Sequence, residues 1–121
     1  MYADPQSLTI GGAATSFVRQ GSPKPDSLGM FQDASGVYDL QVRQNKTSTR
    51  FRREVRLTKR VVASDPISAI NKEQSASIMI VIDEPKWGFS DATLAEMSAA
   101  LITWFSASSY AKQGQLLSGE S

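Results

Sequence analysis

The residues with the clearest chemical potential lie between positions 43 and 60, in the stretch RQNKTSTRFRREVRLTKR. This stretch holds eight Lys or Arg and a single acid, Glu54, although the formal net charge of the chain is only +1. Six of the eight are Arg, whose planar guanidinium group can form paired hydrogen bonds with a phosphate. Such a composition predicts binding to a polyanion, and a nucleic-acid backbone is the polyanion that it favours.

The side chains that most often carry out catalysis are missing. The chain has neither His nor Cys, which removes the commonest general base, the best nucleophile and the usual nitrogen and sulfur metal ligands. Asp83 and Glu84 are adjacent in a predicted strand, where neighbours point to opposite faces, so they do not form an acid–base pair. No Gly-rich phosphate loop, serine nucleophile elbow or calcium loop occurs. We therefore expect no enzyme activity, no metal site and no cofactor, and a carboxylate-based nuclease has little support.

Length and composition predict one soluble domain. A chain of 121 residues, 40% hydrophobic and 21% charged, suits a single globular domain with a modest core. The opening MYADPQSLTI lacks the basic and apolar runs of a secretion signal. The longest apolar run, residues 78 to 82, is far below the roughly 18 residues of a membrane span. We expect a protein without an export signal and without a membrane partner.

Two central strands are predicted to place the basic residues on one face. Residues 37 to 44 and residues 49 to 63 both alternate between apolar and polar side chains. If the two segments pair through a turn near residues 46 to 48, one face carries Gln41, Arg43, Arg50, Arg52 and Arg56. The opposite face carries Tyr38, Leu40, Val42, Phe51, Val55 and Leu57. Arg53 falls on this apolar face, and the pattern leaves open a bulge, a subunit boundary or a mistaken register.

The other segments complete a layered α+β pattern. Residues 1 to 20 predict a hairpin turning at Gly11-Gly12, residues 21 to 27 a loop, and residues 28 to 33 a short strand. Residues 64 to 75 are polar and contain Pro66, which predicts a long loop. Residues 76 to 85 predict a strand with Ile78, Ile80 and Ile82 on one face and Ser77, Met79 and Val81 on the other.

A helix is predicted from residue 90 onward. Ser90 can cap its first turn, and Asp91 suits the positive end of the helix dipole. Apolar side chains then recur at helical spacing, at Leu94, Met97, Leu101, Trp104 and Phe105. The tail predicts a second short helix interrupted near Gly114. An antiparallel sheet followed by an amphipathic helix indicates an α+β fold in one domain, 1 to 121, with its sheet in 28 to 85 and its helices in 90 to 121.

The sequence pattern leaves two questions open: whether the basic face binds a ligand, and what covers the apolar side of the helix. A polar strand face is often merely solvated, and charged strands deter aggregation. The excess of one sign and of Arg favours RNA instead, although the basic face offers no aromatic side chain for base stacking. The helix also has more apolar surface than a small chain can bury, so we expect oligomerisation to cover it. The alternative, covering by the N-terminal hairpin, is less favoured because the hairpin is short.

Three quoted stretches together resemble one family. They are SGVYDLQVRQNKTSTRFRREVRLTKRVV, ASIMIVIDEPKWGFSDATLAEMSAALITWF and the ending LLSGES, which are similar in order and spacing to the coat proteins of small single-stranded RNA bacteriophages, the levivirus type. The resemblance implies an interlocked homodimer in which two sheets join edge to edge and each helix crosses the partner's sheet. Such dimers assemble into an icosahedral shell around the RNA genome, so the protein would be found in the virion after assembly in the bacterial cytoplasm.

The resemblance also assigns roles to residues. An RNA hairpin at the replicase start would bind the inner sheet face and repress translation, through Asp39, Gln41, Arg43, Asn45, Arg50, Arg52, Glu54, Ser77, Met79 and Val81, with Arg56 on the same basic face. The dimer core would consist of Tyr38, Leu40, Val42, Ile78, Ile80, Ile82, Leu94, Met97, Leu101, Trp104 and Phe105. The loop of residues 64 to 75, around Pro66, would make contacts at the symmetry axes of the shell. A stand-alone dimeric RNA-binding regulator that forms no shell is the alternative hypothesis.

Overall fold

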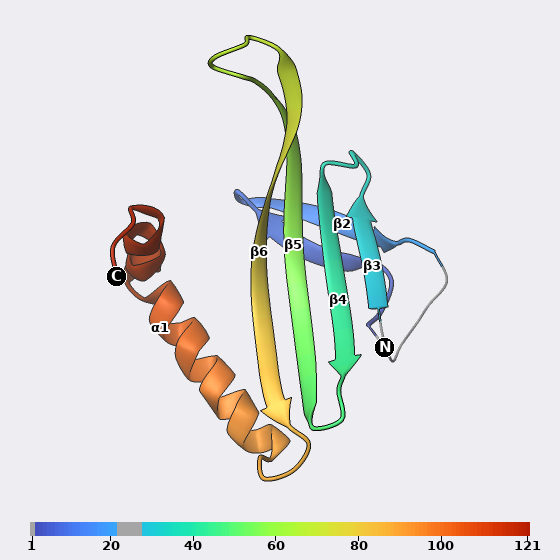
Figure 1. Cartoon of the computed structure of the whole chain (residues 1–121), viewed down its shortest axis with the longest axis vertical. Helices are drawn as coiled ribbons and strands as arrows, with labels where there is room; N and C mark the ends of the chain where they lie inside the picture. Colours follow the sequence, from blue (N-terminus) through green and yellow to red (C-terminus); the bar gives the residue numbers. More distant parts are fainter. Residues whose placement is uncertain (1, 22–27) are drawn as a thin grey trace. The chain divides into compact units, whose positions relative to one another are not determined.

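The computed structural model describes residues 2–21 and 28–121. Six strands form one sheet in chain order (Figure 1), and a single helical element follows them. The strands are β1 (Gln6–Ile10), β2 (Ala13–Arg19), β3 (Leu28–Asp33), β4 (Tyr38–Lys46), β5 (Arg50–Ser64) and β6 (Asn71–Pro85), and the helix is α1 (Asp91–Leu117). This architecture confirms the predicted α+β class. The chain divides into two compact units at Glu84 and Pro85, and each unit is described by itself.

Turn chemistry explains how the first strands connect. Gly11 and Gly12 both adopt positive φ angles, 60° and 83°, which match the twist of a two-residue hairpin between β1 and β2. At the turn between β3 and β4, the Asp33 carboxylate accepts hydrogen bonds from the Ser35 hydroxyl at Oδ2 and from the N–H of Tyr38 at Oδ1. The predicted hairpin and short strand are confirmed, whereas the loop predicted at 21 to 27 lies almost wholly outside the described residues.

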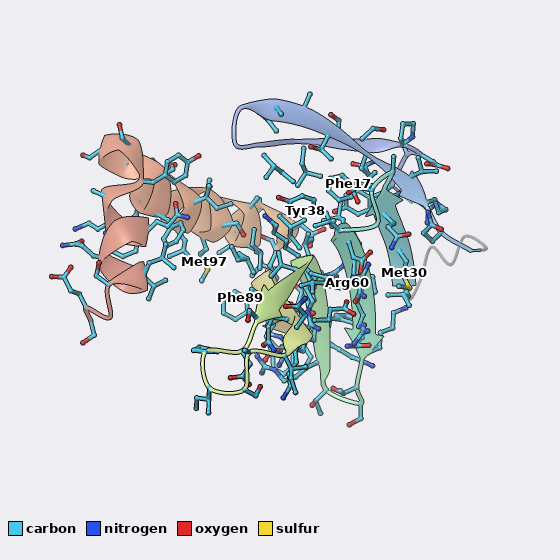
Figure 2. All side chains as sticks on the ribbon, turned by 90° about the horizontal axis from the view of Figure 1, so that it is seen from above. Phe17, Met30, Tyr38, Arg60, Phe89 and Met97 are labelled. Atoms are coloured by element: carbon cyan, nitrogen blue, oxygen red, sulfur yellow. The ribbon has the colours of Figure 1, made fainter. Side chains whose placement is uncertain are left out.

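The core of the first unit lies between the hairpin and the central strands. Phe17, Phe31 and Leu40 are buried, with exposures of 0%, 1% and 7%. Five partly buried side chains pack against them: Leu8, Ile10, Tyr38, Val55 and Leu57. In Figure 2, Phe17 and Tyr38 lie between the hairpin and the main sheet. The hairpin therefore covers the β3–β5 part of the sheet, whereas the alternative that it buries the apolar side chains of the helix is not observed, since no residue of α1 is buried.

Strands β5 and β6 are longer than predicted. The pairing of β4 with β5 ends at Tyr38 and Lys59, so the ends of β5 and β6 continue as a two-stranded ribbon (Figure 1). The loop between them is only residues 65–70, and the prediction of a loop through residue 75 was wrong. Residues 71–75, NKEQS, are all polar, so they lack the alternation of apolar and polar side chains on which a strand prediction depends.

Helix α1 begins as predicted but is interrupted elsewhere. The Ser90 hydroxyl accepts a hydrogen bond from the N–H of Thr93, at 3.2 Å, which confirms the N-cap. Residues 107–110 are non-helical, and Ser108, Ser109 and Tyr110 have positive φ angles. The predicted break near Gly114 was wrong: the interruption lies at residues 107–110, where Ser108 and Ser109 are weaker helix formers than the alanines and leucines before them. No helix in the described part of the chain is long and apolar enough to span a membrane.

Candidate nucleic-acid interface

The polar side chains of three strands share one face of the sheet. The β4–β5 register places Gln41 opposite Arg56, Arg43 opposite Glu54, and Asn45 opposite Arg52. Contacts continue the face onto β6, where the hydroxyls of Thr58 and Ser77 lie 3.0 Å apart and Arg56 approaches the Met79 sulfur at 3.1 Å. We call this surface the polar face. It comprises Asp39, Gln41, Arg43, Asn45, Arg50, Arg52, Glu54, Arg56, Thr58, Arg60, Glu73, Ser77, Met79, Val81 and Asp83.

All eleven residues predicted to bind RNA lie on the polar face, since they share its strand parity. The turn of residues 47–49 brings β4 and β5 together as predicted, and Arg50 donates its N–H to the Thr47 hydroxyl. Met79 and Val81 are apolar and 49% and 39% exposed, at the β6 end of the face. The face is therefore charged along β4 and β5 and has an apolar segment, Met79 and Val81, within β6.

The polar face is less basic than the sequence indicates. Arg50 pairs with Asp83 at 2.9 Å, and Arg56 pairs with Glu54 at 3.1 Å. Arg60 contacts two carboxylates, Asp39 at 2.8 Å and Glu73 at 3.7 Å. Three of these four acids lie outside residues 43 to 60, so a charge count over that stretch missed them. Period-two alternation had already placed Asp39 on this face, and the same signal on β6 would have added Asp83.

Arg43 and Arg52 differ from the other arginines of the face. Within residues 2–21 and 28–121, neither forms an ion pair with a carboxylate. They are diagonal neighbours across β4 and β5, because Arg43 faces Glu54 and Arg52 faces Asn45. Arg52 is exposed and Arg43 is half-buried. These two guanidinium groups are therefore free to bind a phosphate.

Glu54 is buried on this otherwise open face, with 9% of its surface exposed. Its carboxylate accepts from Arg56, and Arg43 lies directly opposite it on β4. The Nε of Arg56 is also buried and has no hydrogen-bond partner in the described part of the chain. A carboxylate covered in this way acts on its neighbours more than on a large ligand, because it holds the Arg56 guanidinium against the sheet.

Arg53 lies on the opposite, mainly apolar face because it pairs there with a buried carboxylate. The β4–β5 register is unbroken at this point, with Gln44 opposite Arg53, so neither a bulge nor a register error is present. Arg53 donates from Nε to the Glu84 carboxylate at 2.8 Å, and its Nη2 lies 2.6 Å from the same oxygen. Glu84 is only 4% exposed. Arg53 is therefore the partner of a buried acid near the end of β6.

Much of the apolar surface of β6 and α1 is uncovered. Ile78 and Ile80 are 69% and 53% exposed, and no residue of α1 is buried. On the helix the exposed apolar side chains include Met97, Leu101, Trp104, Leu116 and Leu117. In contrast, Leu40 and Val42, which were predicted to need a partner subunit, are already buried within the chain.

The loop of residues 65–70 has a defined shape. Asp65 accepts hydrogen bonds from the N–H groups of Ile67 and Ser68, and these bonds hold the pKa of its carboxyl below the ordinary value. Ile67 is almost fully exposed.

Within the described residues, no group of three or more acidic side chains could hold a metal ion.

Comparison with known proteins finds likeness in structure. No family model matches the chain, and no curated protein does. The subunit of a virus-like particle of bacteriophage AVE019 matches with a TM-score of 0.71 and 19% identity, over 89% of this chain and 90% of that chain. The subunit of a virus-like particle of Beihai levi-like virus 21 has a TM-score of 0.71 and 9% identity, over 97% and 94% of the two chains. The capsid protein of bacteriophage GA has a TM-score of 0.61 and 9% identity, over 96% and 95%. The chain therefore has the fold of levivirus-type coat proteins across most of its length.

Proposed function

We propose that the protein is the coat subunit of a single-stranded RNA virus of bacteria, which dimerises and assembles into an icosahedral shell around RNA. The observation that carries this proposal is the match to subunits of virus-like particles over about nine-tenths of the chain or more. The assembled protein would be part of the virion, formed in the cytoplasm of a bacterial host. Its role would be structural, with RNA binding as the second activity.

The exposed apolar surface supports a homodimer. A strand at a sheet edge has unpaired N–H and C=O groups, and β6 is the last strand of the sheet. Pairing of two β6 strands would satisfy these groups and would double the sheet. The apolar side of α1, including Met97, Leu101 and Trp104, would then cover Ile78 and Ile80 of the partner. Burial of such large side chains is a strong driving force for association.

The polar face would form the inner surface of the shell and contact RNA. Arg43 and Arg52 would bind phosphates, while Gln41 and Asn45 would hydrogen-bond to bases. Met79 and Val81 would offer an apolar surface to an unstacked base. Binding of one RNA hairpin at the replicase start would repress translation and select the genome for packaging.

Particle formation tests the assembly proposal. The chain is expressed in bacteria and analysed by light scattering on a sizing column, with ultraviolet absorbance and electron microscopy of the leading peak. We expect uniform hollow spheres that contain nuclease-protected RNA. A discrete dimer with no larger species, even after RNA is added, would contradict the shell and favour a stand-alone regulator.

Replacement of Arg43 tests the RNA contact. Arg43→Ala should weaken RNA binding and reduce the salt dependence of the binding constant by about 0.7 in slope, the value for one phosphate contact on a single strand. Lys59→Ala is the matched control, because Lys59 lies on the opposite face over the ring of Tyr38. Equal effects of the two substitutions would show that net charge, and not the polar face, determines binding.

A further inference from the structure

We propose that the carboxylates of the polar face are built-in counter-anions that confine phosphate binding to Arg43 and Arg52. In this arrangement Asp83 neutralises the charge of Arg50, and Asp39 with Glu73 neutralises the charge of Arg60. This role rests on the proposed function, because it requires RNA to meet the polar face. It identifies acids, in addition to the basic residues, as determinants of which RNA is bound.

The geometry of the ion pairs is the first observation behind this inference. Arg50 and Asp83 come from different strands, and their Nε and Oδ1 atoms form a charge-assisted hydrogen bond of 2.9 Å. Arg60 is held by Asp39, by Glu73 and also by the carbonyl of Gly36, at 2.7 Å. Arg60 thus already has several of the oxygen partners that a phosphate would otherwise supply, and Arg50 has a carboxylate oxygen at its Nε.

The second observation is the exposure of the paired side chains, which differs between the Arg50–Asp83 pair and the Arg56–Glu54 pair. The side chains of Arg50 and Asp83 are 49% and 46% exposed, so a phosphate can reach them. A phosphate that approaches Arg50 must compete with the Asp83 carboxylate, which already holds the Nε of Arg50 at 2.9 Å. Arg50 is therefore accessible to RNA but electrically neutralised. Glu54, in contrast, is buried, and its carboxylate pairs with Arg56 at 3.1 Å.

Selectivity is the functional consequence. A face with five free arginines would bind the phosphates of any RNA, because phosphate contacts carry no sequence information. A face with two free arginines in each subunit has weaker general affinity, so that contacts to bases contribute a larger share of the binding free energy. The four carboxylates would thus reduce the packaging of unrelated RNA.

The decisive variant is Asp83→Asn, which removes the charge that neutralises Arg50 and keeps the shape of the side chain. Binding of a uridylate homopolymer to the full-length protein is measured by filter binding at several salt concentrations. We expect a few-fold tighter binding at low salt and a slope steeper by about 0.7, since one further phosphate is contacted. Glu120→Gln is the matched control, because it makes the same charge change at the C-terminus and should leave the slope unchanged.

The same substitution made in Arg50→Gln protein separates the effect on RNA binding from any effect on folding. In Arg50→Gln protein, the further change Asp83→Asn should leave the binding constant and the slope unaltered, because no guanidinium group is left to release. A gain in binding that persists without Arg50 would overturn the inference, as would an Asp83→Asn slope equal to that of the parent protein. If neither the parent protein nor the Asp83→Asn protein binds RNA, the RNA-binding proposal itself is overturned. If only the Asp83→Asn protein binds RNA, the counter-anion role is supported.

Discussion

The region of the β1–β2 hairpin and the region of β6 and α1 differ in how much of their apolar surface is buried within the chain. Around the β1–β2 hairpin, Phe17 and Phe31 are almost fully buried, and the central strands supply the other half of the same core. On β6 and α1, in contrast, large apolar side chains such as Ile78 and Trp104 are more than half exposed. The hairpin region is self-sufficient, whereas β6 and α1 have the composition of a core without the cover of one.

This contrast fits the proposal that one chain contributes to two kinds of core. The first is formed within a subunit and would exist at any concentration. The second would form only between subunits, because burial of β6 and α1 is proposed to require a second copy. Stability measured at different protein concentrations should separate the two, since dimer formation follows mass action and folding of a single chain does not.

The largest effect is expected from the core within the subunit. Phe17→Ala should destabilise the protein by about 3 to 5 kcal/mol, because it removes a fully buried aromatic ring and leaves a cavity. Urea unfolding followed by circular dichroism measures this loss. The same loss is expected at every protein concentration once dimer dissociation is included in the fit. Retention of full stability would show that the hairpin does not form the core.

Trp104→Ala should act on the core between subunits. We expect a loss of about 3 kcal/mol in the free energy of dimerisation, since Trp104 is 54% exposed within the chain and would be covered by the partner. Sedimentation over a range of concentrations measures the dimer constant. Val62→Ala, which replaces an exposed apolar residue of the ribbon, is the control. An unchanged dimer constant for Trp104→Ala would remove the helix from the interface.

A smaller loss is expected from the ion pair at the end of β6. Arg53→Ala should cost about 2 kcal/mol in folding free energy, because it leaves the buried Glu84 carboxylate without its partner. Arg52→Ala is the matched control, since Arg52 is on the same strand, faces the other way and has no ion pair in the described part of the chain. Thermal unfolding compares the two. Equal stability of both variants would show that Glu84 does not depend on Arg53.

The smallest effect is expected from the turn between β3 and β4. Burial alone would raise the pKa of Asp33, but hydrogen bonds from the Ser35 hydroxyl and the N–H groups of Tyr38, Gly36 and Val37 outweigh it and hold the pKa below 3.8. The ionised form therefore stabilises the fold above pH 3.8, and this stabilisation is lost as the pH falls through the lowered pKa. Asp33→Asn should reduce the acid dependence of the melting temperature. An identical pH profile would contradict this role.

The alternating strands and the capped helix could be predicted from the sequence. Residues 37 to 44 show a period of two because one face is buried and the other is not, and Ser90 begins the helix as its chemistry requires. The first residues of β6 could not be predicted in this way. Residues 71–75, NKEQS, are all polar, so no alternation of apolar and polar side chains marks them as a strand.

The electrostatics of the polar face were predicted only in part. Strand parity correctly placed Arg43, Arg50, Arg52 and Arg56 on one face. It did not reveal the pairing of Arg50 with Asp83, because these residues are 33 positions apart and meet only when β5 and β6 are aligned. Arg53 was ambiguous for the same reason, since its buried partner Glu84 is on another strand.

The most direct test of the central claim is amide hydrogen exchange along β6 in the purified protein. In a strand at a free sheet edge only alternate N–H groups are bonded, whereas a strand paired on both sides protects consecutive ones. The account predicts slow exchange at consecutive residues from Ile78 to Ile82, because β6 of a second copy pairs with this edge. Alternating fast and slow exchange from Ile78 to Ile82 would contradict it and would show that β6 remains unpaired.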